Sequence, residues 1–197
     1  MHDPAHSPDR QDAPERLIER YVDGDEEAFE SLVGLYEERL FAFIARFVGD
    51  SHLAEDVFQQ TFVKVAINAL TFDGRASFST WLFRIARNTA LDELRRRRRN
   101  PVADGEYGRM EYENRADASS LAPLDKLEQD ELSERVRTAL AGIPQPQREA
   151  FLLKEEGGFD FAEIGEILGC GRETAKSRFR LAVGKLRESL GMDGSRT

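Results

Sequence analysis

The sequence predicts an all-α protein made of two small helical domains joined by a flexible acidic linker. Apolar residues recur at spacings of three and four along most of the chain, and strand-like alternation is nearly absent. The chain has 197 residues, 40% of them hydrophobic, which is enough for two compact helical cores. Between the two periodic regions large apolar residues are scarce. We expect an acidic tail at 1–25, a first domain at 26–99, the linker at 100–125, a second domain at 126–190 and a tail at 191–197.

Three helices are expected in the first domain. The first is periodic from Ala28 until Gly49 interrupts the pattern, and the second carries one continuous apolar stripe over residues 54–69. A turn cluster at 71–79 leads into the third helix, which ends in a run of five arginines. We expect Trp81 of this third helix to pack in the core.

The second domain ends in a predicted helix-turn-helix. Two helical patterns are separated by residues 169–171, Gly-Cys-Gly. In the final helix four apolar residues between Ala175 and Leu186 share one face, which we expect to be buried. The polar residues of this helix point elsewhere, and they are Arg172, Lys176, Ser177 and Arg180. A positive outward face of this kind suits the major groove of DNA, and the alternative is a solvated basic surface.

Charge is strongly patterned along the chain, although the net charge is −9. Residues 75–99 carry eight arginines against two acids, and residues 170–187 carry six bases against one acid. Between them, residues 100–133 carry nine acids against three bases. Two basic blocks separated by an acidic spacer predict localised rather than nonspecific contact with nucleic acid.

Two further surfaces of the first domain are candidates for binding. Arg84 and Asn88 lie four apart on the third helix, and basic and amide groups suit single-stranded bases and their backbone. The arginines 95–99 are interpreted either as phosphate contacts or as a solvated helix end stabilised by the helix dipole. On the second helix a stripe opposite the core would be exposed and favours a protein interface, and it consists of Asp56, Gln60, Val63 and Ile67.

Several functional classes are disfavoured by the sequence. No Gly-rich phosphate loop and no Ser/His/Asp set is present, so we expect no enzymatic activity and no catalytic residue. One cysteine, Cys170, and three histidines predict no disulfide, no metal site and no cofactor. No stretch approaches the roughly 20 apolar residues of a membrane span, and the acidic N-terminus is unlike a signal peptide, so we expect a cytoplasmic protein without membrane insertion.

Three segments together resemble the extracytoplasmic-function (ECF) class of the sigma-70 family. They read AEDVFQQTFVKV, FDGRASFSTWLFRIARNTALDELRRRRR and ILGCGRETAKSRFRLAVGKLR, and the resemblance covers residues 26–190. It implies a sigma factor whose region 2 binds the polymerase clamp and opens the minus-10 element, while region 4 reads the minus-35 element. The implied partners are core RNA polymerase, through its beta-prime clamp and beta flap, promoter DNA and an anti-sigma factor. The linker is implied to run through the RNA path of the polymerase.

The resemblance also implies roles for individual residues. The core-polymerase-binding residues are Asp56, Gln59, Gln60, Val63 and Ile67, and the family more often has Glu where Gln60 stands. The minus-10 contacts are Asp73, Ser77, Thr80, Arg84, Arg87 and Asn88, with Asn88 holding a flipped base and the loop 73–80 shaping its pocket. Arg84 and Ile85 stand where housekeeping sigma factors have tandem tryptophans, which implies demanding promoter specificity.

In region 4 the match falls on the final helix. The minus-35 contacts implied are Arg172, Thr174, Lys176, Ser177, Arg178 and Arg180. Glu173, Ala175 and Leu181 replace the more usual Gly, Val and Arg, so we expect a shifted promoter preference.

Two alternatives belong to other functional classes. A stand-alone helix-turn-helix regulator would have the same second domain, but it has no need for the polar and apolar stripe around Asp56 or for the helix with Arg84 and Asn88. An interaction protein with this fold could instead sequester polymerase. Polymerase binding without promoter-dependent transcription would identify it.

Overall fold

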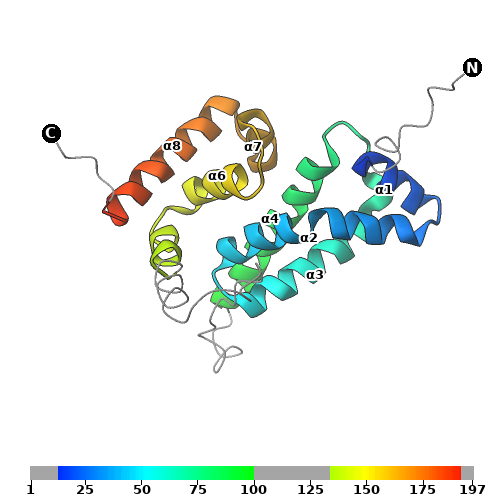
Figure 1. Ribbon diagram of the computed structural model, residues 1–197, viewed down its shortest axis with the longest axis horizontal. Coiled ribbons are helices and arrows are strands. Elements are labelled where there is room, and N and C mark those ends of the chain that lie inside the picture. Colours follow the sequence, from blue (N-terminus) through cyan, green and yellow to red (C-terminus); the bar gives the residue numbers. More distant parts are fainter. Residues whose placement is uncertain (1–12, 100–133, 192–197) are drawn as a thin grey trace, which may run out of the picture.

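The computed structural model describes residues 13–99 and 134–191, and every regular element in these ranges is helical (Figure 1). The first domain contains α1 (Pro14–Val22), α2 (Glu26–Val48), α3 (Ser51–Asn68), the short 3-10 helix η2 (Ala69–Thr71) and α4 (Phe78–Arg99). The second contains a helical segment at 134–141, α6 (Gln145–Glu155), α7 (Phe161–Leu168) and α8 (Arg172–Ser189). The predicted all-α class is confirmed. The predicted linker at 100–125 lies outside the described residues.

Helices α2 and α3 form an antiparallel hairpin, and α4 packs across both. The hairpin turn is specified locally: Gly49 takes a left-handed φ of 74°, and the Asp50 side chain accepts a hydrogen bond from Leu53 N at 2.7 Å. The core of the domain consists of large buried side chains from all three helices, including Phe43, Phe47, Leu53 and Phe83. This core fixes the outward faces of α3 and α4.

Helix α1 corrects the prediction that residues 1–25 form a tail. Leu17 and Ile18 are each only 1% exposed, and Tyr21 packs on Phe29 with ring centroids 4.6 Å apart. These apolar side chains attach α1 to α2. The first domain therefore begins at Pro14, with a nine-residue amphipathic helix. The acidic residues around Leu17 and Ile18 made this short helix hard to recognise in the sequence.

In the second domain a three-residue turn, residues 169–171, joins α7 and α8, which pack against each other as in a helix-turn-helix. Asp160 and Glu163 form a reciprocal capping box at the start of α7. At its end Gly169 has a φ of 64°, and Gly165 lies so close to the turn that a Cβ there would meet Cys170 O at 2.7 Å. The turn between the two helices therefore depends on two glycines.

The two domains pack against each other, with α6 beside α2 and α7 beside α4 (Figure 1). Phe159, in the loop before α7, meets Phe83 edge to face with ring centroids 4.9 Å apart. The Arg39 guanidinium lies over both rings, and Arg46 pairs with Glu156. None of the helices within 13–99 and 134–191 has the length and apolar character to cross a membrane.

Candidate functional site

The stripe predicted on α3 forms one exposed groove. Its lining comprises all five residues assigned to polymerase binding together with one lysine: Asp56, Gln59, Gln60, Val63, Lys64 and Ile67. We call this set the α3 groove. Val63 is 58% exposed and Ile67 is 74% exposed, while Val57 and Val65 on the opposite side of the helix are fully buried. Exposed apolar side chains beside a carboxylate and amides are typical of a protein interface.

Lys64 was not among the predicted residues, and it links the α3 groove to α4. Its Nζ donates a hydrogen bond to Thr89 Oγ1 at 3.0 Å, and Thr89 in turn donates to Ile85 O at 2.9 Å. The lysine ammonium is therefore held at the junction of the two helices.

The loop before α4 is organised by its own polar side chains. Asp73 accepts a hydrogen bond from Arg75 N at 3.1 Å, as in an Asx turn. Ser77 Oγ accepts from Thr80 N at 3.2 Å and donates to Thr80 Oγ1 at 2.9 Å. Ser77 therefore caps α4, and both Asp73 and Ser77 remain exposed.

Thr80 and Trp81 lie in the first turn of α4 and are buried. Thr80 is only 1% exposed, so its predicted direct contact with DNA does not fit the structure, and its hydroxyl supports Ser77 from inside. Trp81 packs against Phe72 and Phe78, with ring centroids 5.3 and 5.8 Å away. The prediction that Trp81 is a core residue is confirmed.

The outward side of α4 presents Arg84, Arg87 and Asn88, but Arg87 is engaged by the second domain. Its Nη2 and Nε lie 2.8 and 3.0 Å from Glu149 Oε2, and Gln145 Nε2 donates to the other carboxylate oxygen at 2.8 Å. The Arg87 side chain is 20% exposed and that of Glu149 is 2% exposed. Asn88 is exposed beside them.

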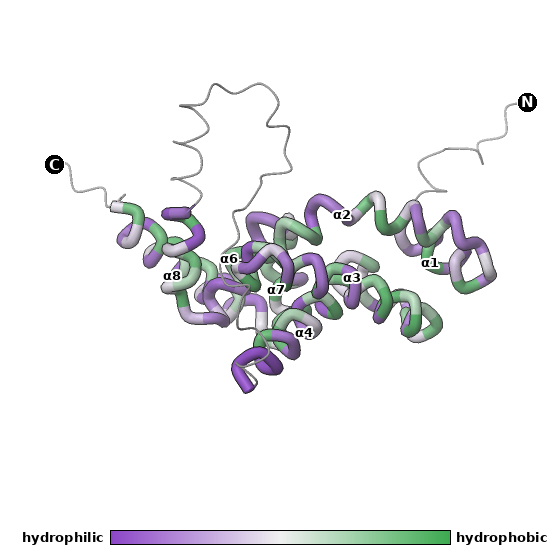
Figure 2. Tube along the Cα trace, turned by 90° about the horizontal axis from the view of Figure 1, so that it is seen from below, coloured by the Kyte–Doolittle hydropathy of each residue, from purple (hydrophilic) through white to green (hydrophobic). Residues whose placement is uncertain are grey.

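Three of the five arginines that end α4 form ion pairs within the first domain. Arg95 pairs with Asp92, Arg96 with Glu93, and Arg97 with Asp50 at 3.5 Å. The Arg96 hydrogen bond lowers the pKa of Glu93 below its ordinary value, against the effect of burial. Arg98 and Arg99 are exposed, and the hydrophilic end of α4 is visible in Figure 2. Only Arg97 of this run is half-buried in its ion pair, and the other four arginines are exposed.

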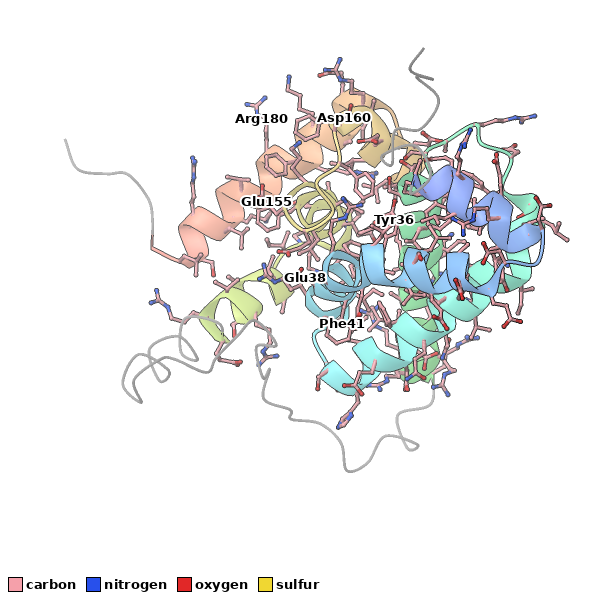
Figure 3. The ribbon with its side chains drawn as sticks, turned by 45° about the vertical axis from the view of Figure 1, so that its right-hand side comes forward. Tyr36, Glu38, Phe41, Glu155, Asp160 and Arg180 are labelled. Atoms are coloured by element: carbon pink, nitrogen blue, oxygen red, sulfur yellow. The ribbon has the colours of Figure 1, made fainter. Side chains whose placement is uncertain are left out.

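On α8 the basic face predicted from the sequence is exposed. Ala175 and Ala182 are fully buried, and Phe179 packs on Phe151 and Phe161. The other side of the helix carries exposed polar side chains, and we call this set the α8 face: Arg172, Thr174, Lys176, Ser177 and Arg180. Arg180 projects from the outer side of α8, away from the first domain (Figure 3).

Arg178 differs from the other predicted contacts of α8. It is half-buried, and its Nη1 donates a hydrogen bond to Cys170 Sγ at 3.5 Å. The guanidinium thus joins α8 to the turn before it. Leu181, where a basic residue is more usual in the family, is 53% exposed.

Comparisons with known proteins agree with this division into two domains. The family described as Sigma-70 region 2 matches residues 32–100, and the family described as Sigma-70, region 4 matches residues 133–186. The first match contains the α3 groove and α4, and the second contains the helix-turn-helix. A stand-alone helix-turn-helix regulator is thereby excluded.

Relatives of known name match over nearly the whole chain. The ECF RNA polymerase sigma factor SigW of Bacillus subtilis is 30% identical over 178 residues, covering 89% of this chain and 95% of SigW. The RNA polymerase sigma factor CarQ of Myxococcus xanthus is 35% identical, covering 88% and 95%. The sigma factor RpoE of Bartonella quintana, solved in complex with the anti-sigma factor NepR, is 28% identical with a TM-score of 0.66, covering 84% and 98%. The chain belongs to the ECF sigma factors of the sigma-70 family and is an alternative sigma factor that directs transcription initiation.

Proposed function

We propose that the α3 groove binds core RNA polymerase at the beta-prime clamp. The observation that carries this proposal is the exposure of Val63 and Ile67 in one row with Asp56, on the side of α3 that the domain core leaves uncovered. Apolar side chains would supply contact area, and the carboxylate would pair with a basic group of the clamp. Gln60, where the family more often has Glu, would contribute a hydrogen bond in place of a second charge.

The exposed part of the loop before α4 and the outward side of α4 read the minus-10 element. Asn88 is exposed one turn beyond Arg84, and an amide offers both a donor and an acceptor to the edge of a flipped base. Flipping a base costs a few kcal/mol, so a preorganised pocket matters. The hydrogen bonds of Asp73 and Ser77 supply such order in the loop.

Promoter contact by Arg87 requires α6 to leave α4. In the arrangement described above, both Arg87 nitrogens that face the second domain are bonded to Glu149, and neither is available to a phosphate or base. Breaking this pair leaves the Glu149 carboxylate without a cation, bonded only to Gln145, and exposure to water on domain separation would relieve that cost. Polymerase, which contacts both domains, would hold them apart.

The α8 face reads the minus-35 element in the major groove. Arg and Lys pair with the guanine acceptors O6 and N7, and Ser or Thr contacts bases or phosphates. Arg172 and Thr174 lie in the first turn of α8, the part of a recognition helix that comes closest to base edges. The exposed Leu181 would favour contact with a thymine methyl group over the guanine contact of a basic residue.

We also infer the cellular setting and the partners of the second domain. The second domain would bind the beta flap of polymerase, and an anti-sigma factor would cover the α3 groove, because Val63 and Ile67 offer apolar area to either partner. The similar sigma factor RpoE was solved with the anti-sigma factor NepR, which supports this inference. The protein would act in the cytoplasm, where the polymerase works.

The test of the proposal is gel filtration of the chain with bacterial core RNA polymerase at moderate salt. The parent is expected to co-elute stoichiometrically, and Asp56→Arg is expected to bind about tenfold more weakly or worse, because like charges would face each other. Glu55→Arg is the matched control, since Glu55 is an exposed acid of the same helix outside the α3 groove.

Equal binding by the parent and Asp56→Arg would remove the α3 groove from the interface. Run-off transcription then follows with the co-eluted complex. Promoter-dependent transcripts support initiation by this chain, whereas binding without transcripts would favour a protein that sequesters polymerase.

A further inference from the structure

An acidic side chain of α1 holds the start of α4. Phe78 N donates a hydrogen bond to Glu15 Oε1 at 2.9 Å, across 63 positions of sequence. Phe78 is the first residue of α4, and the first N–H groups of a helix have no partner within it. With Ser77 Oγ accepting from Thr80 N, the first turn of α4 is held both by its own loop and by α1.

The Glu15 carboxylate is itself held in place by the core. Leu17 and Ile18, two and three residues further along α1, are almost completely buried. Pro14 starts the helix, so Glu15 lies in its first turn and is half-buried. A negative charge at the N-terminus of α4 is also favoured by the helix dipole.

The contact lies beside the loop assigned above to the minus-10 element. Ser77, Ser79 and Thr80 form a hydroxyl cluster, with Ser77 Oγ 3.1 Å from Ser79 Oγ. Tyr36 of α2 packs on Phe78 beside this cluster, with ring centroids 5.5 Å apart. Glu15 and the hydroxyl cluster therefore both lie at the start of α4, next to the exposed part of the loop.

We propose that Glu15 is a positioning residue for minus-10 recognition: its hydrogen bond to Phe78 N fixes the start of α4 and with it the loop that carries Asp73 and Ser77. This inference rests on the proposed reading of the minus-10 element by that loop. Glu15 does not contact DNA. Loss of this hydrogen bond would allow the loop to move relative to Asn88, which lies nearly three helical turns beyond Phe78 on α4.

The test compares Glu15→Ala, Glu15→Gln and the control Glu19→Ala, each assembled with core polymerase. Three affinities are measured: for core polymerase, for a minus-35 duplex and for a single-stranded minus-10 oligonucleotide of the non-template strand. Glu15→Ala is expected to bind the minus-10 strand about tenfold more weakly, the effect of losing a hydrogen bond to a charged group, with the other two affinities unchanged. Glu15→Gln retains an acceptor oxygen and should recover most of the affinity, and Glu19, exposed one turn later, should have no effect.

Unchanged minus-10 binding by Glu15→Ala would overturn the proposal. An equal loss of all three affinities would also overturn it, because Glu15 would then serve the stability of the whole domain. If the parent complex itself does not bind the minus-10 strand, the proposed function of the loop is wrong, and the positioning role is wrong with it. This result differs from a failure of the positioning role alone, in which the parent and Glu15→Ala bind the strand equally well.

Discussion

The two helices assigned to promoter DNA present their basic groups very differently. On α8 the side chains of the basic face are exposed, and Arg180 points away from the rest of the protein (Figure 3). On α4 Arg87 is bonded to Glu149 of α6 through two nitrogens. The α8 face is exposed in the free chain, whereas on α4 Asn88 is exposed and Arg87 is held by the chain's own second domain.

The difference shows that exposure of a basic residue depends on the arrangement of domains as well as on the helix that carries it. The buried side of α8 consists of apolar residues, among them Ala175, Phe179 and Ala182, so the packing of the helix leaves the α8 face exposed. The contact of α4 with α6 instead uses Arg87, the same residue that we propose for DNA contact. We therefore expect minus-35 binding to be independent of domain closure and minus-10 binding to depend on it.

The largest expected effect is on DNA binding by the α8 face. The double variant Lys176→Ala, Arg180→Ala should lower affinity for a minus-35 duplex about 100-fold, because each lost contact of this kind is worth roughly 1–3 kcal/mol. Binding to core polymerase should not change. Fluorescence anisotropy with a labelled duplex measures the first quantity, and gel filtration the second.

Lys185→Ala provides the control for that variant. Lys185 is an exposed cation of the same helix, but nine residues beyond Lys176 it lies on the opposite side. A similar loss in Lys185→Ala would mean that α8 binds DNA through general positive charge, and the assignment of the α8 face would be wrong.

A smaller effect is expected on α4, where a substitution should raise the affinity for DNA instead of lowering it. Glu149→Gln weakens the ion pair with Arg87, so the free chain should bind a minus-10 single strand about tenfold more tightly, the equivalent of roughly 1.4 kcal/mol. Its affinity for the minus-35 duplex should stay the same. Titration of both oligonucleotides with the free chain measures the two effects.

Glu155→Gln removes an equal charge from the exposed part of α6 and should change neither affinity. If the two glutamine variants bind the minus-10 strand equally, charge near the DNA rather than release of Arg87 explains the gain. The contact between Arg87 and Glu149 would then have no effect on minus-10 binding.

Within α8, Arg178 sharpens the comparison, because it is the one predicted contact that also holds the protein together. Arg178→Ala should weaken minus-35 binding by about threefold, less than the roughly tenfold expected for Arg180→Ala alone. It should also lower the thermal midpoint, since α8 loses its link to Cys170. An affinity loss as large as that of Arg180→Ala would show that Arg178 turns toward DNA on binding.

The smallest expected effect concerns stability and pH. Two backbone N–H groups, of Glu163 and Ala162, lower the pKa of Asp160 below its ordinary value of 3.8. A lowered pKa in the folded state means that the ionised cap stabilises the protein above the unfolded pKa and that this contribution is lost as pH falls through the folded pKa. Asp160→Ala should therefore have a lower thermal midpoint at neutral pH. The gap from the parent should shrink as the pH falls below about 4, and a constant gap would contradict this origin.

Much of the fold and two of the three surfaces could be predicted from the sequence. The exposure of Val63 and Ile67 and the burial of Ala175 follow from helical periodicity alone, because each lies on a continuous stripe. Trp81 was assigned to the core for the same reason. Such local patterns do not depend on where the domains lie.

The features that sequence reasoning missed are long-range contacts. Glu15 meets Phe78 and Glu149 meets Arg87 across about sixty positions, and no periodicity marks an acid as the partner of a distant group. Thr80 was misassigned because a hydroxyl in a polar loop gives no sign of facing inward. These contacts depend on tertiary packing, which cannot be predicted from the local sequence pattern.

The account is tested most directly by holding the domains together. In a Cys170→Ser background, Arg46→Cys and Glu156→Cys place thiols at an ion pair between α2 and the end of α6, outside all three binding surfaces, where a bismaleimide can bridge them. We predict that the bridged chain keeps its affinity for the minus-35 duplex and binds the minus-10 strand about tenfold more weakly than the unbridged variant, because Arg87 stays bonded to Glu149. Equal minus-10 binding before and after bridging would contradict the claim that minus-10 binding depends on the release of Arg87 from the second domain.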